Sequence, residues 1–382
     1  MPDYEIILQE IMLTDKHNKN CVDCDSCNVE YASCNIGVFL CARCASVHRK
    51  MGTHISKVIS LNQVWNQSQV ERMREVGNKK AKLKYEYRVP PCYRRPNSSD
   101  PQVLIEQWIR AKYERGEFTQ TGRPNYISGH LEGFLMKRGK EDARYQPRKF
   151  ILSEATDTLR YFVKESKEPK AIIRISDLNA VLAPKKMEHE NSMQLTFMKD
   201  GSSRHIYLYH DEGEVIVNWY MAIRCAKLHR LQVAYPMQSE CNLTDCLSND
   251  FAKEGWILKT GPRPSDGYKM RWFSLDDVQR KLMYQVEPLG AFPKGEIFLG
   301  YKLDGFSIRV GAPIGAKDQG FSFTLTTPER VYNMSVSNNV ERDDWIDCIQ
   351  KVFEKPLTPQ DSSLSARLIR KRTTSTSLFL GK

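Results

Sequence analysis

The sequence lacks any run of about 18 apolar residues, the length that a helix needs to cross a bilayer, so no membrane span is expected. The N-terminus, MPDYEIILQE, is acidic and has no basic flank before its apolar residues, which argues against a secretory signal. Most of the chain is also poor in cysteine, because six of the 11 cysteines fall between Cys21 and Cys44. An odd number of cysteines without a signal predicts reduced, intracellular thiols rather than a disulfide framework.

The overall composition is that of a soluble globular protein, with 41% hydrophobic and 27% charged residues. A length of 382 residues suggests two or three domains. The net charge of +11 favours anionic partners, which include nucleic acid, an anionic membrane surface and acidic proteins. Charge alone does not choose among them.

The clustered cysteines form two close pairs, Cys21-x2-Cys24 and Cys41-x2-Cys44, separated by 16 residues. Four thiolates in this spacing surround one zinc ion tetrahedrally and leave no open position, so the predicted site is structural. Cys27 offers an alternative pairing with Cys24, but the Cys21 pair stands at the distance familiar from zinc modules. The segment has no dense basic recognition helix, and specific nucleic-acid binding is therefore not expected.

The first part of the chain is predicted to be mostly helical and to span residues 1–125. Apolar periodicity and stop signals predict helices at residues 4–13, 42–51, 65–76, 79–88 and 103–118. Pro90-Pro91 ends the fourth helix, and Asp100 is the predicted cap of the fifth, with proline following it at the first helical position.

After a turn-rich linker at residues 120–130, short alternating runs predict strands, and the pattern then occurs twice. Glu132-Gly133-Phe134-Leu135 recurs as Glu254-Gly255-Trp256-Ile257, about 122 residues later. We expect two domains, 130–232 and 252–356, each with about seven antiparallel strands and one C-terminal helix. Trp219 and Trp345 should lie in the cores of those helices, and Phe134 and Trp256 should be buried in strands. Residues 357–382 look like a basic, disordered tail.

Residues 31–58 contain the pattern A-S-x-N-x-G-x-x-x-C-x-x-C-x-x-x-H-R-x-x-G-x-H-x-S-x-V. This segment resembles the catalytic zinc module of GTPase-activating proteins for Arf GTPases, the ArfGAP family. The two later copies resemble pleckstrin homology (PH) domains, and the order is similar to that of the dual-PH, centaurin-alpha Arf activators. The resemblance covers about residues 5–354. It implies a multidomain α+β fold, a mostly helical four-cysteine zinc-finger domain followed by two seven-stranded PH domains.

The resemblance assigns the essential arginine of the family to Arg49. It implies that Arg49 supports GTP hydrolysis in trans, as an arginine finger that neutralises charge on the phosphoryl oxygens of GTP-bound Arf. His48 is expected to be packed support. We expect a stimulator of hydrolysis by Arf, and not an enzyme with its own substrate turnover. Tyr31 stands where the family usually has Trp, and Ile59 and Asn62 also depart from its pattern. These departures leave open a non-catalytic, phosphoinositide-dependent adaptor.

Both PH copies carry basic residues where strands meet a loop, an arrangement that suits the phosphates of an inositol headgroup. The predicted phosphoinositide-binding residues are Lys137, Arg148 and Tyr161 in the first copy and Lys259, Lys269, Arg271 and Tyr284 in the second. Gln146 replaces a basic residue in the first copy, so that site is less complete. The expected ligand is phosphatidylinositol 3,4,5-trisphosphate or a related polyphosphoinositide.

The expected cofactor is one structural Zn²⁺, and the expected partners are GTP-bound Arf, phosphoinositides or inositol polyphosphates, and a peripheral membrane surface. The resemblance implies a cytoplasmic protein recruited to the plasma membrane. The basic tail is also compatible with nuclear import.

Overall fold

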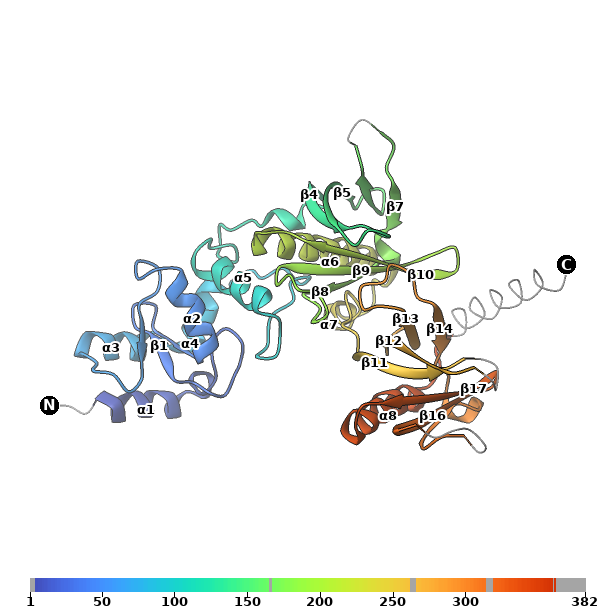
Figure 1. The fold of residues 1–382 in the computed structure, drawn as a ribbon. Helices are drawn as coiled ribbons and strands as arrows, with labels where there is room; N and C mark the ends of the chain where they lie inside the picture. The colour runs from blue at the N-terminus through green and yellow to red at the C-terminus, as the bar shows by residue number, and fades with distance from the viewer. Residues whose placement is uncertain (1–3, 165–166, 262–265, 314–318, 360, 362–382) are drawn as a thin grey trace.

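A computed structural model describes residues 4–164, 167–261, 266–313, 319–359 and 361 (Figure 1). The predicted basic tail, residues 357–382, therefore lies outside the described residues except at 357–359 and 361. A helical unit comes first and is followed by two units that are each built on a sheet. Among the described residues, no helix combines the length and the apolar character needed to cross a membrane.

The helical unit contains the five predicted helices and a small sheet that the sequence did not predict. Its elements are α1 (Tyr4–Thr14), η1 (Lys16–Lys19), β1 (Tyr31–Ser33), β2 (Val38–Leu40), α2 (Ala42–Lys50), β3 (Val58–Ser60), α3 (Gln67–Glu75), α4 (Gly77–Tyr85), α5 (Gln102–Tyr113) and η2 (Asn125–Ile127). The strand order is β2-β1-β3. Cys41 is the N-cap of α2, where its side chain accepts a hydrogen bond from the backbone of Cys44, so the second cysteine pair fixes where this helix begins.

The predicted capping role of Asp100 is wrong. Pro101 is the N-cap of α5, and no side chain caps this helix. The Asp100 carboxylate instead accepts a hydrogen bond from the backbone of Asn97 at 2.8 Å and pairs with Arg94. Asp100 is buried, and ionised buried carboxylates need a cationic partner, which explains why it faces Arg94.

Each of the next two units contains seven antiparallel strands and a closing helix, as predicted. The first has β4 (His130–Arg138), β5 (Tyr145–Ser153), β6 (Thr158–Phe162), β7 (Ala171–Arg174), η3 (Ile175–Asp177), β8 (Asn179–Leu182), β9 (Ser192–Lys199), β10 (Ser202–Tyr209) and α6 (Gly213–Ala234). After α7 (Glu240–Thr244), the second has β11 (Lys253–Thr260), β12 (Tyr268–Asp276), β13 (Lys281–Gln285), β14 (Gly295–Phe298), η4 (Lys302–Asp304), β15 (Ser307–Val310), β16 (Phe321–Thr327), β17 (Arg330–Val336) and α8 (Asn339–Glu354). The orders β7-β6-β5-β4-β10-β9-β8 and β14-β13-β12-β11-β17-β16-β15 are equivalent.

The cores of the two sheet units include the closing tryptophans but not the predicted strand aromatics. Trp219 and Trp345 are buried, as predicted. The prediction for Phe134 and Trp256 is wrong, because they are 51% and 40% exposed. Successive strand residues face opposite sides of a sheet, so the following residues, such as Ile257 in β11, fill the core instead.

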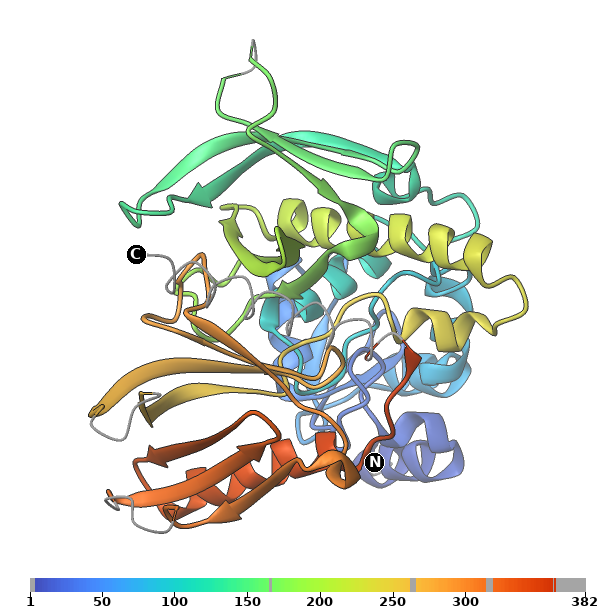
Figure 2. The ribbon, with the colours of Figure 1, turned by 90° about the vertical axis from the view of Figure 1, so that its right-hand side faces the viewer.

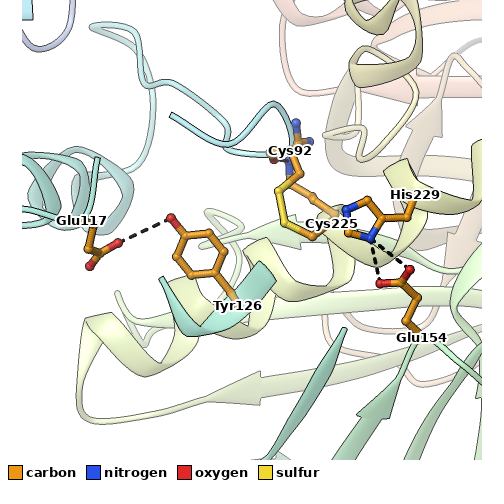
Figure 3. The surroundings of a disulfide bond; sticks show 7 residues. Cys92, Glu117, Tyr126, Glu154, Cys225 and His229 are labelled. Carbon is orange, nitrogen blue, oxygen red and sulfur yellow. Dashed lines mark hydrogen bonds and ion pairs between the residues drawn. A yellow bond between two sulfur atoms is a disulfide. The ribbon is translucent and has the colours of Figure 1, made fainter. Parts of the chain in front are cut away.

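A disulfide joins the helical unit to the first sheet unit, so the prediction of reduced thiols is wrong for this one pair, while the other nine cysteines are free. Cys92, in the segment after α4, is bonded to Cys225 of α6, 133 residues later (Figure 3). Both cysteines are buried, and the Arg224 guanidinium donates a hydrogen bond to the Cys92 carbonyl at 2.8 Å. Packing of the segment against α6 brings the two cysteines together, and their distant sequence positions do not indicate this.

The two sheet units also contact each other through residues 286–294, which connect β13 and β14. The backbone of His205 donates a hydrogen bond to the Ala291 carbonyl at 3.0 Å, and the Tyr207 hydroxyl donates to the Gly290 carbonyl at 3.3 Å. Figure 2 shows that the β4–β5 and β11–β12 strand pairs extend toward the same side of the molecule, on the left of that view.

Candidate zinc module and phosphoinositide sites

The four paired cysteines come together in one buried cluster. The sulfur atoms of Cys21, Cys24, Cys41 and Cys44 all lie within 4.8 Å of one another. Cys27 is exposed and lies outside the cluster, so the alternative pairing with Cys24 is not favoured. Four converging thiols are the donor set of closed structural zinc sites, and these residues therefore fit a zinc ion.

A buried polar network connects the cysteine cluster to the helices around it. His48 is completely buried; its Nδ1 lies 2.8 Å from Ser56 Oγ, and its Nε2 lies 3.0 Å from Asp23 Oδ2. The Lys112 ammonium of α5 pairs with Asp23 at 2.7 Å and with Glu86 at 2.9 Å. The network holds α2 against the first cysteine pair and against α5, which is the packed support expected of His48.

The charges in this network compensate one another. Burial alone would raise the pKa of Asp23, but attraction to Lys112 and the hydrogen bond from His48 outweigh it and hold that pKa well below its usual range. Burial would likewise lower the pKa of Lys112, and the two carboxylates raise it instead. An ionised Asp23 and a charged Lys112 are therefore stable together in a buried position.

Arg49 follows the buried His48 on α2 and is exposed to solvent. Its guanidinium lies 4.7 Å from the centroid of the Tyr31 ring, in a cation–π contact. Within the described ranges, no carboxylate forms an ion pair with Arg49. The phenol at position 31 thus contacts the arginine, although the family pattern has an indole there.

The second sheet unit brings together the four residues predicted for it. Lys259 faces Lys269 directly across the β11–β12 ladder, and Arg271 lies two residues further along β12. The Lys259 ammonium lies 4.9 Å from the centroid of the Tyr284 ring. Burial, then repulsion from Arg330 and from Arg271, lowers the pKa of Lys259 to about 8.

Arg330, at the start of β17, is a basic residue of this site that the sequence reasoning missed. Its guanidinium lies 4.5 Å from the centroid of the Tyr332 ring, which the Lys259 ammonium approaches to 5.8 Å. β17 pairs with β11 although about 70 residues separate the two strands in the sequence. A basic residue beside a strand turn was the signal available in the sequence. The register of the sheet was needed to place that residue next to Lys259.

The first sheet unit brings together Lys137, Arg148 and Tyr161. The Lys137 ammonium lies 5.2 Å from the centroid of the Tyr161 ring, and burial followed by repulsion from Arg148 lowers the pKa of Lys137. Gln146 faces Lys137 across the β4–β5 ladder and accepts a hydrogen bond from Arg148. The amide therefore occupies the place that Lys269 has in the second unit and also engages the arginine.

Comparisons with known proteins agree with this architecture. The profile of the family "Putative GTPase activating protein for Arf" matches residues 6–122, and the PH domain profile matches residues 129–227 and 251–354. The chain is 39% identical to human "Arf-GAP with dual PH domain-containing protein 2" over 357 residues, 92% of this chain and 93% of that protein. The mouse protein of the same name is 38% identical over 92% of this chain and 93% of its own length.

The ArfGAP part alone is also similar to a protein of which it covers only about a quarter. Mouse "Stromal membrane-associated protein 1" is 41% identical over 116 residues, which cover 30% of this chain and 26% of that protein. The expectation that the chain is not an enzyme is wrong, because the matched family stimulates GTP hydrolysis, which is a catalytic activity. With one ArfGAP domain and two PH domains over nearly its whole length, the chain belongs to the family of Arf GTPase-activating proteins with dual PH domains.

Proposed function

We propose that this protein stimulates GTP hydrolysis by an Arf-family GTPase with Arg49 as an arginine finger in trans. The observation that carries the proposal is the contrast on α2, where His48 is buried in an ion network and the next side chain is exposed with no carboxylate partner among the described residues. A guanidinium in this position is free to meet negative charge on the phosphoryl oxygens of a docked GTPase.

One structural Zn²⁺ is proposed at the cysteine cluster. The ligands would be Cys21, Cys24, Cys41 and Cys44. A four-thiolate site supplies no open coordination position, so zinc would stabilise the local fold and take no part in hydrolysis. Its effect on Arg49 is indirect, because α2 begins at the second cysteine pair.

The two PH domains are proposed to recruit the protein to polyphosphoinositides, with phosphatidylinositol 3,4,5-trisphosphate on the cytosolic face of the plasma membrane as the preferred lipid. The proposed binding residues are Lys137, Arg148 and Tyr161 in the first domain and Lys259, Lys269, Arg271 and Tyr284 in the second. In support, the strand pairs that carry the basic residues among them, β4–β5 and β11–β12, extend toward one side of the molecule (Figure 2). Two modest sites on one chain then reinforce each other through a high effective concentration.

The proposed domain boundaries are 1–125 for the ArfGAP domain, 130–232 for the first PH domain and 252–356 for the second. In support, the structure has strands beginning at His130 and Lys253 and closing helices that end at Ala234 and Glu354.

A GTPase assay on vesicles tests the proposal. GTP-loaded Arf is anchored to vesicles with or without phosphatidylinositol 3,4,5-trisphosphate, and hydrolysis is followed after this protein is added. We expect strong stimulation that increases when the trisphosphate lipid is present. Vesicle binding without any stimulation on either membrane would instead favour the adaptor function, which the departures at Tyr31, Ile59 and Asn62 suggested.

A further inference from the structure

The two PH domains have an arginine at the same position of the last strand. In the second domain, β17 pairs with β11 through Met334 and Lys259, and Arg330 lies four residues before Met334. In the first domain, the same count back from Leu208, which pairs with the lysine of that site, leads to Arg204. Side chains four residues apart on a strand lie on the same face, so both arginines begin on the face that carries the site lysine.

In the second domain the arginine joins the site. The Arg330 guanidinium and the Lys259 ammonium donate hydrogen bonds to the same acceptor, the Thr260 carbonyl, at 3.4 Å and 2.9 Å. Both cations also approach the Tyr332 ring. Neither forms an ion pair with a carboxylate in the part of the chain that the structure describes. Asp266 is a nearby carboxylate that favours the charged form of Lys259, but repulsion from Arg330 and Arg271 is larger. Two cations held on one carbonyl therefore provide a strong attraction for an anion.

In the first domain the equivalent arginine is engaged elsewhere. The Arg204 guanidinium lies 3.9 Å from the centroid of the Phe292 ring, which belongs to the β13–β14 connection of the second domain. The same ring is 4.6 Å from the ammonium of Lys140, in the loop between β4 and β5. The Lys137 ammonium donates to the Arg138 carbonyl at 3.1 Å, the counterpart of the Thr260 carbonyl, and no bond from Arg204 reaches this acceptor among the described residues.

The electrostatics of the two site lysines agree with this difference. After burial, Arg330 makes the largest contribution to lowering the pKa of Lys259, ahead of Arg271. After burial, the basic residue that lowers the pKa of Lys137 is Arg148. The second site therefore contains two more close cations than the first, Arg330 and also Lys269, whose place in the first site is taken by Gln146.

We propose that Arg330 binds phosphate in the second PH domain, and that Phe292 withholds the equivalent residue, Arg204, from the first. This inference rests on the proposed phosphoinositide function. It gives the second domain a phosphate-binding arginine that the first domain does not use. The ligand is a polyphosphorylated inositol, either a lipid headgroup or a soluble inositol phosphate. Because a guanidinium binds phosphate through two donors, the second domain takes the more highly phosphorylated headgroup.

The role of Arg330 is tested with two probes, soluble inositol 1,3,4,5-tetrakisphosphate and vesicles containing phosphatidylinositol 3,4,5-trisphosphate. An Arg148→Gln full-length protein serves as the background, so that binding reports on the second domain. Adding Arg330→Gln should weaken binding about tenfold or more, Arg330→Lys should restore part of it, and the thermal unfolding midpoint should not move. A loss with both probes identifies the lipid headgroup as the ligand, and a loss with the soluble probe alone identifies a free inositol phosphate.

The role of Phe292 is tested in an Arg271→Gln background, where binding reports on the first domain. Arg204→Gln should change affinity for the soluble probe less than twofold. Phe292→Ala should tighten binding several-fold, and adding Arg204→Gln to it should remove the gain. Unchanged affinity after Phe292→Ala would show that Phe292 does not keep Arg204 away from the first headgroup site.

The failure of this inference is distinguishable from failure of the proposed function. Wild-type protein that binds neither probe overturns the phosphoinositide function itself. If the Arg148→Gln protein binds, loses binding with Lys259→Ala and keeps it with Arg330→Gln, only the role of Arg330 is overturned.

Discussion

Tyr31 contacts the side chain that we propose to act on GTP. Its ring centroid lies 4.7 Å from the Arg49 guanidinium, so the ring limits the directions in which this arginine points. Cation–π contacts at exposed sites contribute about 0.5–1 kcal/mol. Tyrosine in place of the family's tryptophan therefore keeps a cation–π contact with Arg49 but provides a smaller ring.

Replacing this ring should reduce activity without changing the fold. Tyr31→Leu is expected to lower stimulated GTP hydrolysis about two- to fivefold, the rate equivalent of a lost exposed cation–π contact. Tyr31→Trp is the matched control, and it should retain or exceed the wild-type rate. Equal rates for the Leu and wild-type proteins on the same vesicles would show that the contact does not position Arg49.

Lys259 should make headgroup binding sensitive to pH. Its pKa of about 8 means that it begins to lose its charge just above neutral pH. A bound phosphate favours the charged form, so affinity should fall as pH rises through about 8, and by up to about tenfold near pH 9.

Calorimetric titration with inositol 1,3,4,5-tetrakisphosphate from pH 6.5 to 9 measures this effect. The Lys259→Arg variant keeps its charge throughout the range and corrects for titration of the ligand's own phosphates. If wild type and this variant have the same pH profile, the depressed pKa of Lys259 has no role in binding.

Among the elements, α2 joins the cysteine cluster to the exposed Arg49. Cys41 is its N-cap, its buried side carries Cys44 and His48, and its exposed side carries Arg49. The helix is nine residues long, which is too short to be stable by itself in water. Its position therefore depends on the cluster and on the ion network beneath it.

Removing zinc should abolish GTPase stimulation while leaving headgroup binding by the PH domains. Structural zinc sites contribute directly to folding, so chelation should also decrease the far-ultraviolet circular dichroism of helix. Cys44→Ser should have the same effect, and Cys27→Ser, a change at an exposed cysteine outside the cluster, should not. Full stimulation by metal-free protein would contradict this dependence.

Sequence patterns predicted the elements whose signals are local. The five helices of the first domain and most strands of the repeats follow from periodicity and stop residues, and the cysteine spacing predicted the cluster. Asp100 shows why the rest was not predictable, because a good capping residue served instead as the partner of Arg94. Arg330 and Arg204 have equivalent strand positions, and only the packing of Phe292 between domains separates their roles.

At the scale of the whole molecule, the three domains are connected by more than the chain. The Cys92–Cys225 bond joins the ArfGAP domain to α6, and residues 286–294 join the PH domains. Arg94 adds a link at this junction, with hydrogen bonds to the Tyr220 hydroxyl at 3.2 Å and to Asp250 at 2.8 Å. These contacts fix the position of Arg49 and its helix relative to the basic clusters of the two PH domains.

Reduction of the Cys92–Cys225 disulfide should lower the stability of the protein. A bond across a separation of 133 residues restricts the unfolded chain by about 4–5 kcal/mol in the chain-entropy account. We expect the thermal unfolding midpoint to fall when a phosphine reductant is added, and Cys92→Ser protein to be insensitive to it. Mass spectrometry first confirms that the disulfide is present. If the thermal unfolding midpoint then does not change with reductant, the disulfide does not stabilise the protein.

Arg49 is proposed to act directly on the GTP bound to Arf. Single-turnover hydrolysis by GTP-loaded Arf on trisphosphate-containing vesicles tests this role most directly, with Arg49→Ala compared with Arg230→Ala, a partly exposed arginine of the first PH domain. We predict a loss of about 10³-fold or more for Arg49→Ala, with zinc content and vesicle binding unchanged, and a wild-type rate for the control. A wild-type rate for Arg49→Ala would show that Arg49 takes no part in hydrolysis.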